Sequence, residues 1–157
     1  MKIPMKLILL KIFQVVLFLC TVPAWGADFI PAITNYTVKD YQGAHQNWAC
    51  AQGDDGVMYF GNNNGLLVYD GFSWELHKVP GGYIVRSVFV DKDKIYIGSF
   101  EEFGYFTRNV TGGMEYHSLS AKVKNQVASN DEIWHIVRLE GKIYFQSFTR
   151  WYAFDGK

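Results

Sequence analysis

The sequence has few cysteines and no excess of charge of either sign, and both shortages exclude common classes of protein. Only Cys20 and Cys50 occur among 157 residues, so a disulfide-rich framework is excluded. Lys and Arg together number 15, as do Asp and Glu, and no basic cluster interrupts this balance. Because binding to nucleic acid normally needs a basic patch, we expect this region to bind no nucleic acid.

Motifs for metal binding and catalysis are also missing. The histidines are scattered without metal-ligand spacing, at His45, His77, His117 and His135. The segment GNNNG, residues 61–65, lacks the Lys-Ser/Thr ending of a phosphate-binding loop, and residues 54–56 lack the alternate acidic ligands of a calcium loop. Glu101 and Glu102 are adjacent, and neighbouring strand residues point to opposite faces, so we do not expect an acid/base pair unless the loop reorients them. We predict no catalytic residue, metal ion or cofactor.

The N-terminus has the three-part plan of a secretory signal peptide. A positive stretch, MKIPMK, precedes the apolar run LILLKIFQVVLFLC, and TVPAWGA then supplies small residues. Ala24 and Gly26 fit the small-x-small rule, so we predict cleavage near Gly26 or Ala27. An uncleaved membrane anchor is the alternative, but Lys11 and Gln14 interrupt the run, and a span needs about 20 apolar residues.

Signal removal would leave a single thiol in the mature chain. That chain could form no internal disulfide, although an exported compartment would permit one. Cys50 lies between Ala49 and Ala51 in an apolar strand pattern. We therefore predict that Cys50 is a small core residue rather than a nucleophile.

A pattern of short apolar runs and turns recurs after the signal segment. Tyr59-Phe60-Gly61 returns as Tyr96-Ile97-Gly98 and again as Tyr144-Phe145-Gln146, spaced 37 and then 48 residues apart. Each copy follows a turn, and the three turns are GDDG at 53–56, DKDK at 91–94 and EGK at 140–142. Each unit also has further apolar runs before its turn and after its Tyr copy. They lie at 48–51, 65–71 and 73–79 in the first unit, at 84–90, 103–106 and 114–119 in the second, and at 133–139 and 151–157 in the third.

This repeat predicts an all-β fold made of four-stranded antiparallel units. The spacing brackets the roughly 40–45 residues of a propeller blade. A four-stranded sheet that is apolar on both faces needs a neighbour on each side, and radial stacking of blades supplies them. The expected fold is therefore a partial β-propeller. A two-sheet sandwich of short strands is the alternative.

The first unit resembles the blade repeat of the two-component-regulator propellers. That family's blades carry an aromatic-aromatic-Gly-x-x-x-Gly-Leu-x-x-Tyr-Asp-Gly pattern, and the matching residues are Tyr59, Phe60, Gly61, Gly65, Leu66, Tyr69, Asp70 and Gly71. Residues 35–56 are similar to the start of a sensor group in which a periplasmic propeller precedes a triple-tyrosine domain, a membrane helix and a helix-turn-helix or histidine-kinase output. The second unit departs from the pattern at FEEFGYF, and Gln146 replaces the glycine in the third.

We expect three regions along the chain. Residues 1–26 form the signal peptide, residues 27–45 an N-terminal strand or lead-in, and residues 46–157 about 2.7 blades. The sequence reaches Lys157 without a fourth strand for the third unit, as in the front part of a longer protein. An unclosed stack leaves an apolar face and a strand edge uncovered, so residues 27–157 alone should be poorly soluble or should associate.

The topology of such blades predicts which end could bind a ligand. Connections from strand two to strand three, and those between blades, lie at one end, away from the turns GDDG, DKDK and EGK. Amides beside aromatic rings suit sugar recognition. The candidate ligand-binding residues at this end are Trp48, Asn62, Asn63, Asn64, Tyr83, Glu101, Glu102 and Arg150.

The sequence is consistent with three functions. The resemblance implies an exported sensor on the periplasmic side of the inner membrane, which responds to an oligosaccharide or another small ligand as part of a bacterial transmembrane regulator. Its implied partners are the remaining blades and a triple-tyrosine domain, with a dimer as one assembly. A kinase output could lie beyond this chain, which is itself not expected to be an enzyme. The alternatives are the incomplete propeller of a secreted carbohydrate-active enzyme and a protein-binding scaffold.

Overall fold

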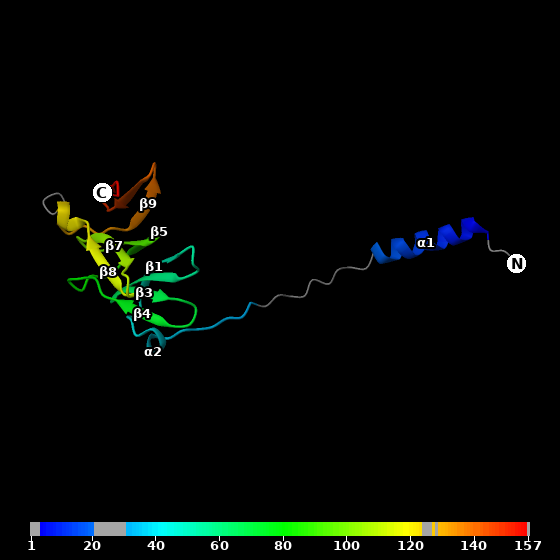
Figure 1. Cartoon of the computed structure of the whole chain (residues 1–157), viewed down its shortest axis with the longest axis horizontal. Coiled ribbons are helices and arrows are strands. Elements are labelled where there is room, and N and C mark those ends of the chain that lie inside the picture. The colour runs from blue at the N-terminus through cyan, green and yellow to red at the C-terminus, as the bar shows by residue number, and fades with distance from the viewer. Residues whose placement is uncertain (1–3, 21–30, 124–126, 128, 157) are drawn as a thin grey trace. The chain divides into compact units, whose positions relative to one another are not determined.

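The chain divides into two compact units, Met1–Thr34 and Asn35–Lys157. The computed structural model describes residues 4–20, 31–123, 127 and 129–156, of which residues 19 and 20 are described by their backbone alone. The first unit contains helix α1 (Met5–Cys20), which covers the apolar run (Figure 1). No helix among the described residues is long and apolar enough to cross a membrane. The predicted cleavage positions, Ala24 to Ala27, lie outside the described residues.

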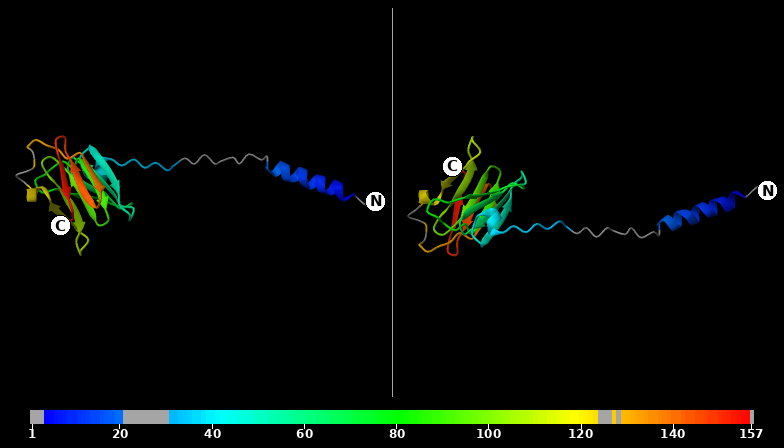
Figure 2. Two further views of the ribbon diagram at one scale, coloured as in Figure 1. Left: turned by 90° about the horizontal axis from the view of Figure 1, so that it is seen from above. Right: turned by 90° about the horizontal axis from the view of Figure 1, so that it is seen from below.

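The second unit consists of three antiparallel sheets that follow one another along the chain (Figures 1 and 2). The first sheet contains β1 (Asn47–Gln52), β2 (Met58–Asn62), β3 (Gly65–Tyr69) and β4 (Trp74–His77). The second contains β5 (Ser87–Asp91), β6 (Lys94–Gly98), β7 (Phe103–Arg108) and β8 (Met114–Ser118). The third contains β9 (His135–Leu139), β10 (Lys142–Gln146) and β11 (Trp151–Phe154). The predicted all-β class and the repeated strand pattern are thus confirmed, and the three sheets do not close on themselves.

Strands within each sheet pair in chain order, and short turns join them. Tyr59 lies opposite Ala51 and Val68, and Tyr96 lies opposite Phe89 and Tyr105. Two short helices interrupt the connections, α2 (Val38–Tyr41) before β1 and the 3-10 helix η1 (Ser120–Val123) after β8. The described part of the lead-in, residues 31–45, contains α2 and forms no strand.

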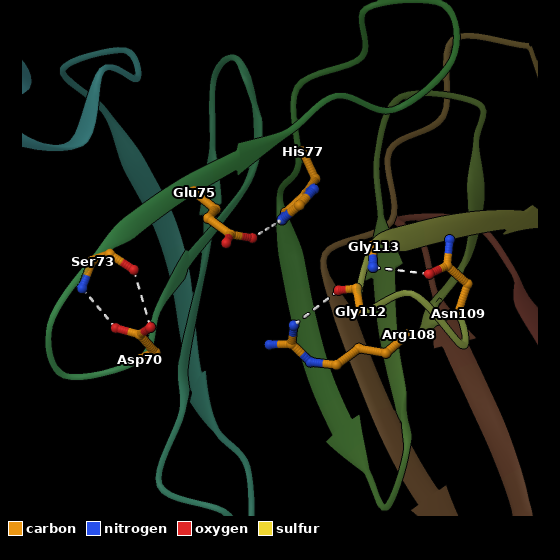
Figure 3. Close-up of polar contacts among 8 residues, drawn as sticks. All are labelled: Asp70, Ser73, Glu75, His77, Arg108, Asn109, Gly112 and Gly113. Atoms are coloured by element: carbon orange, nitrogen blue, oxygen red, sulfur yellow. Dashed lines mark hydrogen bonds and ion pairs between the residues drawn. The ribbon is translucent and has the colours of Figure 1, made fainter.

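Polar side chains close the turns that join β3 to β4 and β7 to β8 (Figure 3). Asp70 accepts hydrogen bonds from the backbone N–H groups of Phe72 and Ser73, at 2.8 and 2.6 Å. These bonds hold the pKa of Asp70 below its ordinary value, the Ser73 N–H contributing most. Asn109 accepts the Gly113 N–H at 2.8 Å in the same way. Such self-closing turns explain why Asp and Asn stand at these points of the repeat.

Apolar side chains join each sheet to the next. Between the first and second sheets, the buried cluster includes Tyr59, Leu66, Val68, Ile95, Ile97 and Phe106. Between the second and third sheets, it includes Tyr96, Phe103, Ile136, Ile143 and Phe145. The second sheet therefore packs on both faces, as the repeat predicts for a unit that needs two neighbours.

Glycine at the end of the second strand allows the next unit to approach closely. A Cβ atom on Gly61 would lie 2.8 Å from the Val85 carbonyl oxygen, and one on Gly98 would lie 2.5 Å from Ile133 Cγ2. Val85 and Ile133 are almost fully buried, and each precedes the first strand of the following sheet. The recurring Tyr-x-Gly of the first two units is therefore a packing requirement between units.

The two outer faces of the stack differ. On the free face of the first sheet, the segment that we call the N-terminal strap, residues 35–45, packs its Tyr36 and Tyr41 rings against Trp74, at 5.2 and 5.6 Å between centroids. The free face of the third sheet leaves apolar side chains exposed, namely Val137, Leu139 and Trp151 at 42%, 59% and 58%.

Cys50 corrects one prediction from the sequence. Its side chain is exposed and not part of the core. Cys50 pairs with Phe60 and shares the free face of the first sheet, while its neighbours Ala49 and Ala51 are half-buried. The strap contacts that face over β3 and β4, at Tyr69 and Trp74, and leaves the β1 edge open.

Candidate functional site

Connections from three units meet at one end of the stack, which we call the connection end. The Val85 N–H donates to the Asn62 carbonyl at 3.1 Å, and the Ile133 N–H donates to the Ser99 carbonyl at 3.0 Å. A further bond runs from the Glu101 N–H to the Asp131 carbonyl, at 2.8 Å. These bonds tie each β2–β3-type connection to the segment that leads into the next sheet. The candidate residues from the sequence therefore lie at one end, as the topology predicts.

Three equivalent residues form a cluster that joins the sheets at this end. Arg86 and Trp134 precede the first strands of the second and third sheets, and their N–H groups donate to Gly98 and Gln146 carbonyls, each at 2.8 Å. Trp48 occupies the matching place in the first sheet, at an irregularity between Asn47 and Ala49. We call Trp48, Arg86 and Trp134 the axial cluster.

The Arg86 guanidinium lies against both tryptophan rings of the axial cluster. Its central carbon is 3.9 Å from the Trp48 ring centroid and 5.4 Å from that of Trp134. The two rings themselves meet edge to face at 6.0 Å. A cation over an indole face contributes about 0.5–2 kcal/mol, depending on how far it is desolvated. The cluster therefore binds three sheets together as well as presenting a surface.

Polar neighbours fix the orientation of the axial cluster. Trp48 Nε1 donates to Asn63 Oδ1 at 2.6 Å. Arg86 donates to Glu132 Oε1 through Nε and Nη2, at 3.3 and 3.1 Å. Arg86 Nη1 and Trp134 Nε1 are buried and have no hydrogen-bond partner among the described residues. The cluster thus has capacity for further hydrogen bonds that these residues do not fill.

Exposed aromatic rings surround the cluster. Phe148 packs on Trp134 with centroids 5.5 Å apart and is 78% exposed. Phe100, which has the equivalent place in the second sheet, is 38% exposed and bridges to Glu132. Trp48 is 37% exposed. Rings that are rigidly backed and open to solvent are suited to stacking on a flat apolar ligand surface.

A second feature of the connection end is a polar cavity of about 340 Å³. It brings together three residues predicted from the sequence, Tyr83, Glu101 and Glu102, and its wall also includes Ser120 and Ser129. Glu101 adopts a left-handed φ of 52°, so the two glutamates lie in a turn and both line the cavity. The loop therefore reorients the two glutamates, which is the exception that the sequence left open.

Hydroxyl groups surround the Glu102 carboxylate. Tyr116 and Ser118 donate to Oε1, at 2.7 and 2.8 Å, and Ser120 donates to Oε2 at 2.7 Å. Burial raises the pKa of Tyr116, and the charge of Glu102 raises it further. The Ser118 oxygen also accepts the Ala121 N–H at 3.2 Å, so this network ties Glu102 to β8 and to the start of η1.

The remaining predicted residues play different parts. Asn62 is fully buried, and its side chain bonds to Ala44, Gln46, Asn47 and the Asn64 N–H, so it holds the chain rather than facing solvent. Asn64 is exposed in the turn after β2. Arg150 is exposed in the β10–β11 connection, and its N–H donates to Ser147 Oγ at 2.9 Å.

Sequence reasoning missed Arg86, Glu132 and Trp134. Each lies just before a strand and carries no motif, so a local pattern does not single it out. Trp48, Arg86 and Trp134 come into register when the three units are aligned at Ala49, Ser87 and His135, the residues that pair with Gly61, Gly98 and Gln146. Asp131 also lies in the connection that precedes β9. Burial acts to raise its pKa, but hydrogen bonds from Ser147, Thr149 and backbone N–H groups hold the pKa below its ordinary value.

Other parts of the described chain offer less chemistry. A hollow of about 480 Å³ between β4 and β8 is lined by His77, Phe106 and Tyr116, among others, and His77 pairs with Glu75 at 3.0 Å (Figure 3). No group of three or more His, Cys, Asp or Glu residues that could hold a metal ion occurs in the described ranges.

Comparison with known proteins adds one solved structure to this picture. No family model matches the chain, and no curated protein matches it. The fold is similar to that of the extracellular domain of the "putative one component system BT4673" from B. thetaiotaomicron, with a TM-score of 0.60 and 16% identity. The match covers 75% of this chain and 16% of that domain, so the chain spans about a sixth of its length. At this identity the likeness establishes a shared fold.

Proposed function

We propose that this chain is the ligand-sensing, exported part of a bacterial transmembrane regulator. Its three sheets would be successive blades of a β-propeller, and its ligand a glycan-derived molecule bound at the connection end. The observation that carries the proposal is the convergence of exposed aromatic rings from three consecutive units around Trp48, Arg86 and Trp134, with the Asn63 amide bonded to Trp48. A binding surface shared among units suits a sensor, because ligand contact can alter how the units pack.

The fold likeness supports this proposal at the level of architecture. The similar structure is described as an extracellular domain of a one-component system, and a sensing role on the periplasmic side of the inner membrane would fit such an architecture. The apolar N-terminal segment with helix α1 would serve as the export signal. Further blades and a triple-tyrosine domain would complete the protein, which could act as a dimer.

We propose ligand binding rather than catalysis as the role of this chain. The carboxylates at the connection end already have partners: Glu132 binds Arg86, Glu102 accepts three hydroxyl protons, and Asp131 accepts the Thr149 hydroxyl at 2.8 Å. These contacts suit a rigid recognition surface. Any kinase or DNA-binding output would belong to another part of the protein.

The test uses the full-length protein and a reporter gene under its control. Asn63→Ala releases Trp48, and Arg150→Ala removes an exposed cation from the same end, so we expect both to blunt the response to the inducing glycan. Phe72→Ala, which changes a 93% exposed ring in the β3–β4 turn, is the matched control. Unchanged dose-response curves for both variants would refute the assignment. Reading the coding sequence beyond Lys157 tests the regulator itself, which requires a membrane helix and an output domain.

A further inference from the structure

We infer that the axial cluster recognises an uncharged sugar and discriminates against acidic ones. This inference rests on the proposed function and specifies its ligand class. The cluster has three properties that bear on ligand charge: the pairing of Arg86, the position of the neighbouring carboxylates, and the exposure of its aromatic rings.

The positive charge of Arg86 is already neutralised. Glu132 lies 3.1 Å from Nη2, and the side chains of this pair are only 14% and 22% exposed. An anionic ligand would have to compete with a partly buried carboxylate for the same guanidinium. Removing one partner from such a pair is costly, because the other charge is left buried and unpaired. Glu132 therefore fixes the planar Arg86 guanidinium in place, and the charge of Arg86 is not available to bind an anionic ligand.

The surrounding connections carry negative charge close to the cluster. Asp131 directly precedes Glu132 and remains ionised, since its hydrogen bonds hold its pKa low. Glu101 lies next to both, because its N–H donates to the Asp131 carbonyl and Phe100 bridges to Glu132. Arg150, in the third unit, adds one exposed guanidinium to this end, against the carboxylates of Glu101, Asp131 and Glu132. Because the carboxylates outnumber the guanidinium groups in these connections, a carboxylate or sulfate on the ligand would be disfavoured.

The features that remain suit a neutral sugar. Phe148, Trp48 and Phe100 offer exposed ring faces for the apolar face of a pyranose. Arg86 Nη1 and Trp134 Nε1 supply donors without partners among the described residues, and sugar hydroxyl or ring oxygens accept such bonds. Buried donors are partnered in nearly all proteins, so an oxygen acceptor near these two atoms is expected.

The test compares glycans that differ in charge, with the purified full-length protein as the probe protein. An array of neutral oligosaccharides and of uronate-containing or sulfated ones is screened, and each hit is titrated by tryptophan fluorescence. We expect the hits to be neutral, Phe148→Ala to weaken them about tenfold, and Phe72→Ala to leave them unchanged. Trp134→Phe keeps an aromatic side chain but removes the Nε1 donor together with the five-membered ring of the indole, so it should weaken binding, and circular dichroism checks that the fold is intact.

Each alternative outcome decides a different claim. Hits confined to acidic glycans would overturn the inference and leave the sensor proposal standing. Neutral hits that tolerate both Phe148→Ala and Trp134→Phe would also overturn it, because the sugar would then bind elsewhere. Absence of any hit would overturn the glycan ligand and this inference together.

Discussion

Gly98→Ala is the substitution that most sharply tests how consecutive sheets are joined. The added methyl group would lie 2.4 Å from Ser87 Oγ and 2.5 Å from Ile133 Cγ2. Non-bonded carbon atoms normally approach to about 3.5–4.0 Å, so the segment around Ile133 must retreat by about 1 Å. Gly98 has no left-handed φ, so the test isolates the close approach from backbone strain.

The expected cost follows from the contacts that would be disturbed. Overpacking of a filled core destabilises by about 1–3 kcal/mol. The added methyl group would also disturb the Ser87 Oγ–Ile133 carbonyl bond of 2.9 Å, and loss of that bond would add about 1 kcal/mol. We therefore expect the free energy of unfolding to fall by about 2–4 kcal/mol.

Urea unfolding followed by tryptophan fluorescence measures this loss. A lower midpoint at an unchanged slope would show reduced stability rather than a changed denatured state. The control is Gly113→Ala, whose Cβ would lie 3.2 Å from the end of the Asn109 side chain in an exposed turn, and we expect a change below about 0.5 kcal/mol. If Gly98→Ala unfolds at the same urea concentration as the unmodified chain, the close approach between sheets is not a packing requirement.

Further predictions concern charge, burial and association. The pKa of Asp131 is held low, so its contribution to stability is present above its unfolded pKa and is lost as pH falls through the folded value. Asp131→Asn should flatten that acid loss in unfolding curves taken from pH 6 down to pH 2. Burial raises the pKa of Tyr96 to about 12. The stability that the protonated Tyr96 contributes is therefore complete below about pH 10 and is lost as pH rises through about 12. An ultraviolet titration would show the ionisation of Tyr96 as a late step. Glu102→Gln should lower the free energy of unfolding by about 1–3 kcal/mol, because three hydroxyl donors lose a charged acceptor; an unchanged urea midpoint would refute the role given to that carboxylate. Leu139→Glu should reduce self-association in light scattering more than Val110→Glu does, since only Leu139 lies on the open face of the third sheet; equal effects would contradict that assignment.

The strands were predictable because local chemistry repeats along the chain. Turns such as GDDG and DKDK stand between alternating apolar runs, and a hairpin needs little else to be recognised. The grouping of the connections at one end also followed from strand order alone. In both cases, the relevant information lies within a few residues or follows from topology.

The burial of individual side chains, and the meeting of side chains from different units, were less predictable. The neighbours of Cys50 suggested a core position, but its exposure depends on how far the strap covers the first sheet. From the sequence, the Asn62 side chain is expected in an exposed connection. In the structure it is fully buried and forms hydrogen bonds with Ala44, Gln46 and Asn47. Arg86 and Trp134 come from different units, and their meeting depends on the packing between sheets. Such contacts are set by tertiary structure, and a single unit does not encode them.

The central claim is that consecutive four-stranded units stack around a common axis, with Trp48, Arg86 and Trp134 at equivalent inner positions. A crystal structure of the complete exported region of the protein tests this most directly. It should show a closed ring in which further units continue the series and the free face of the third sheet, including Leu139, is covered by the next one. A structure in which these sheets pack as a sandwich, or in which that face meets solvent, would contradict the claim.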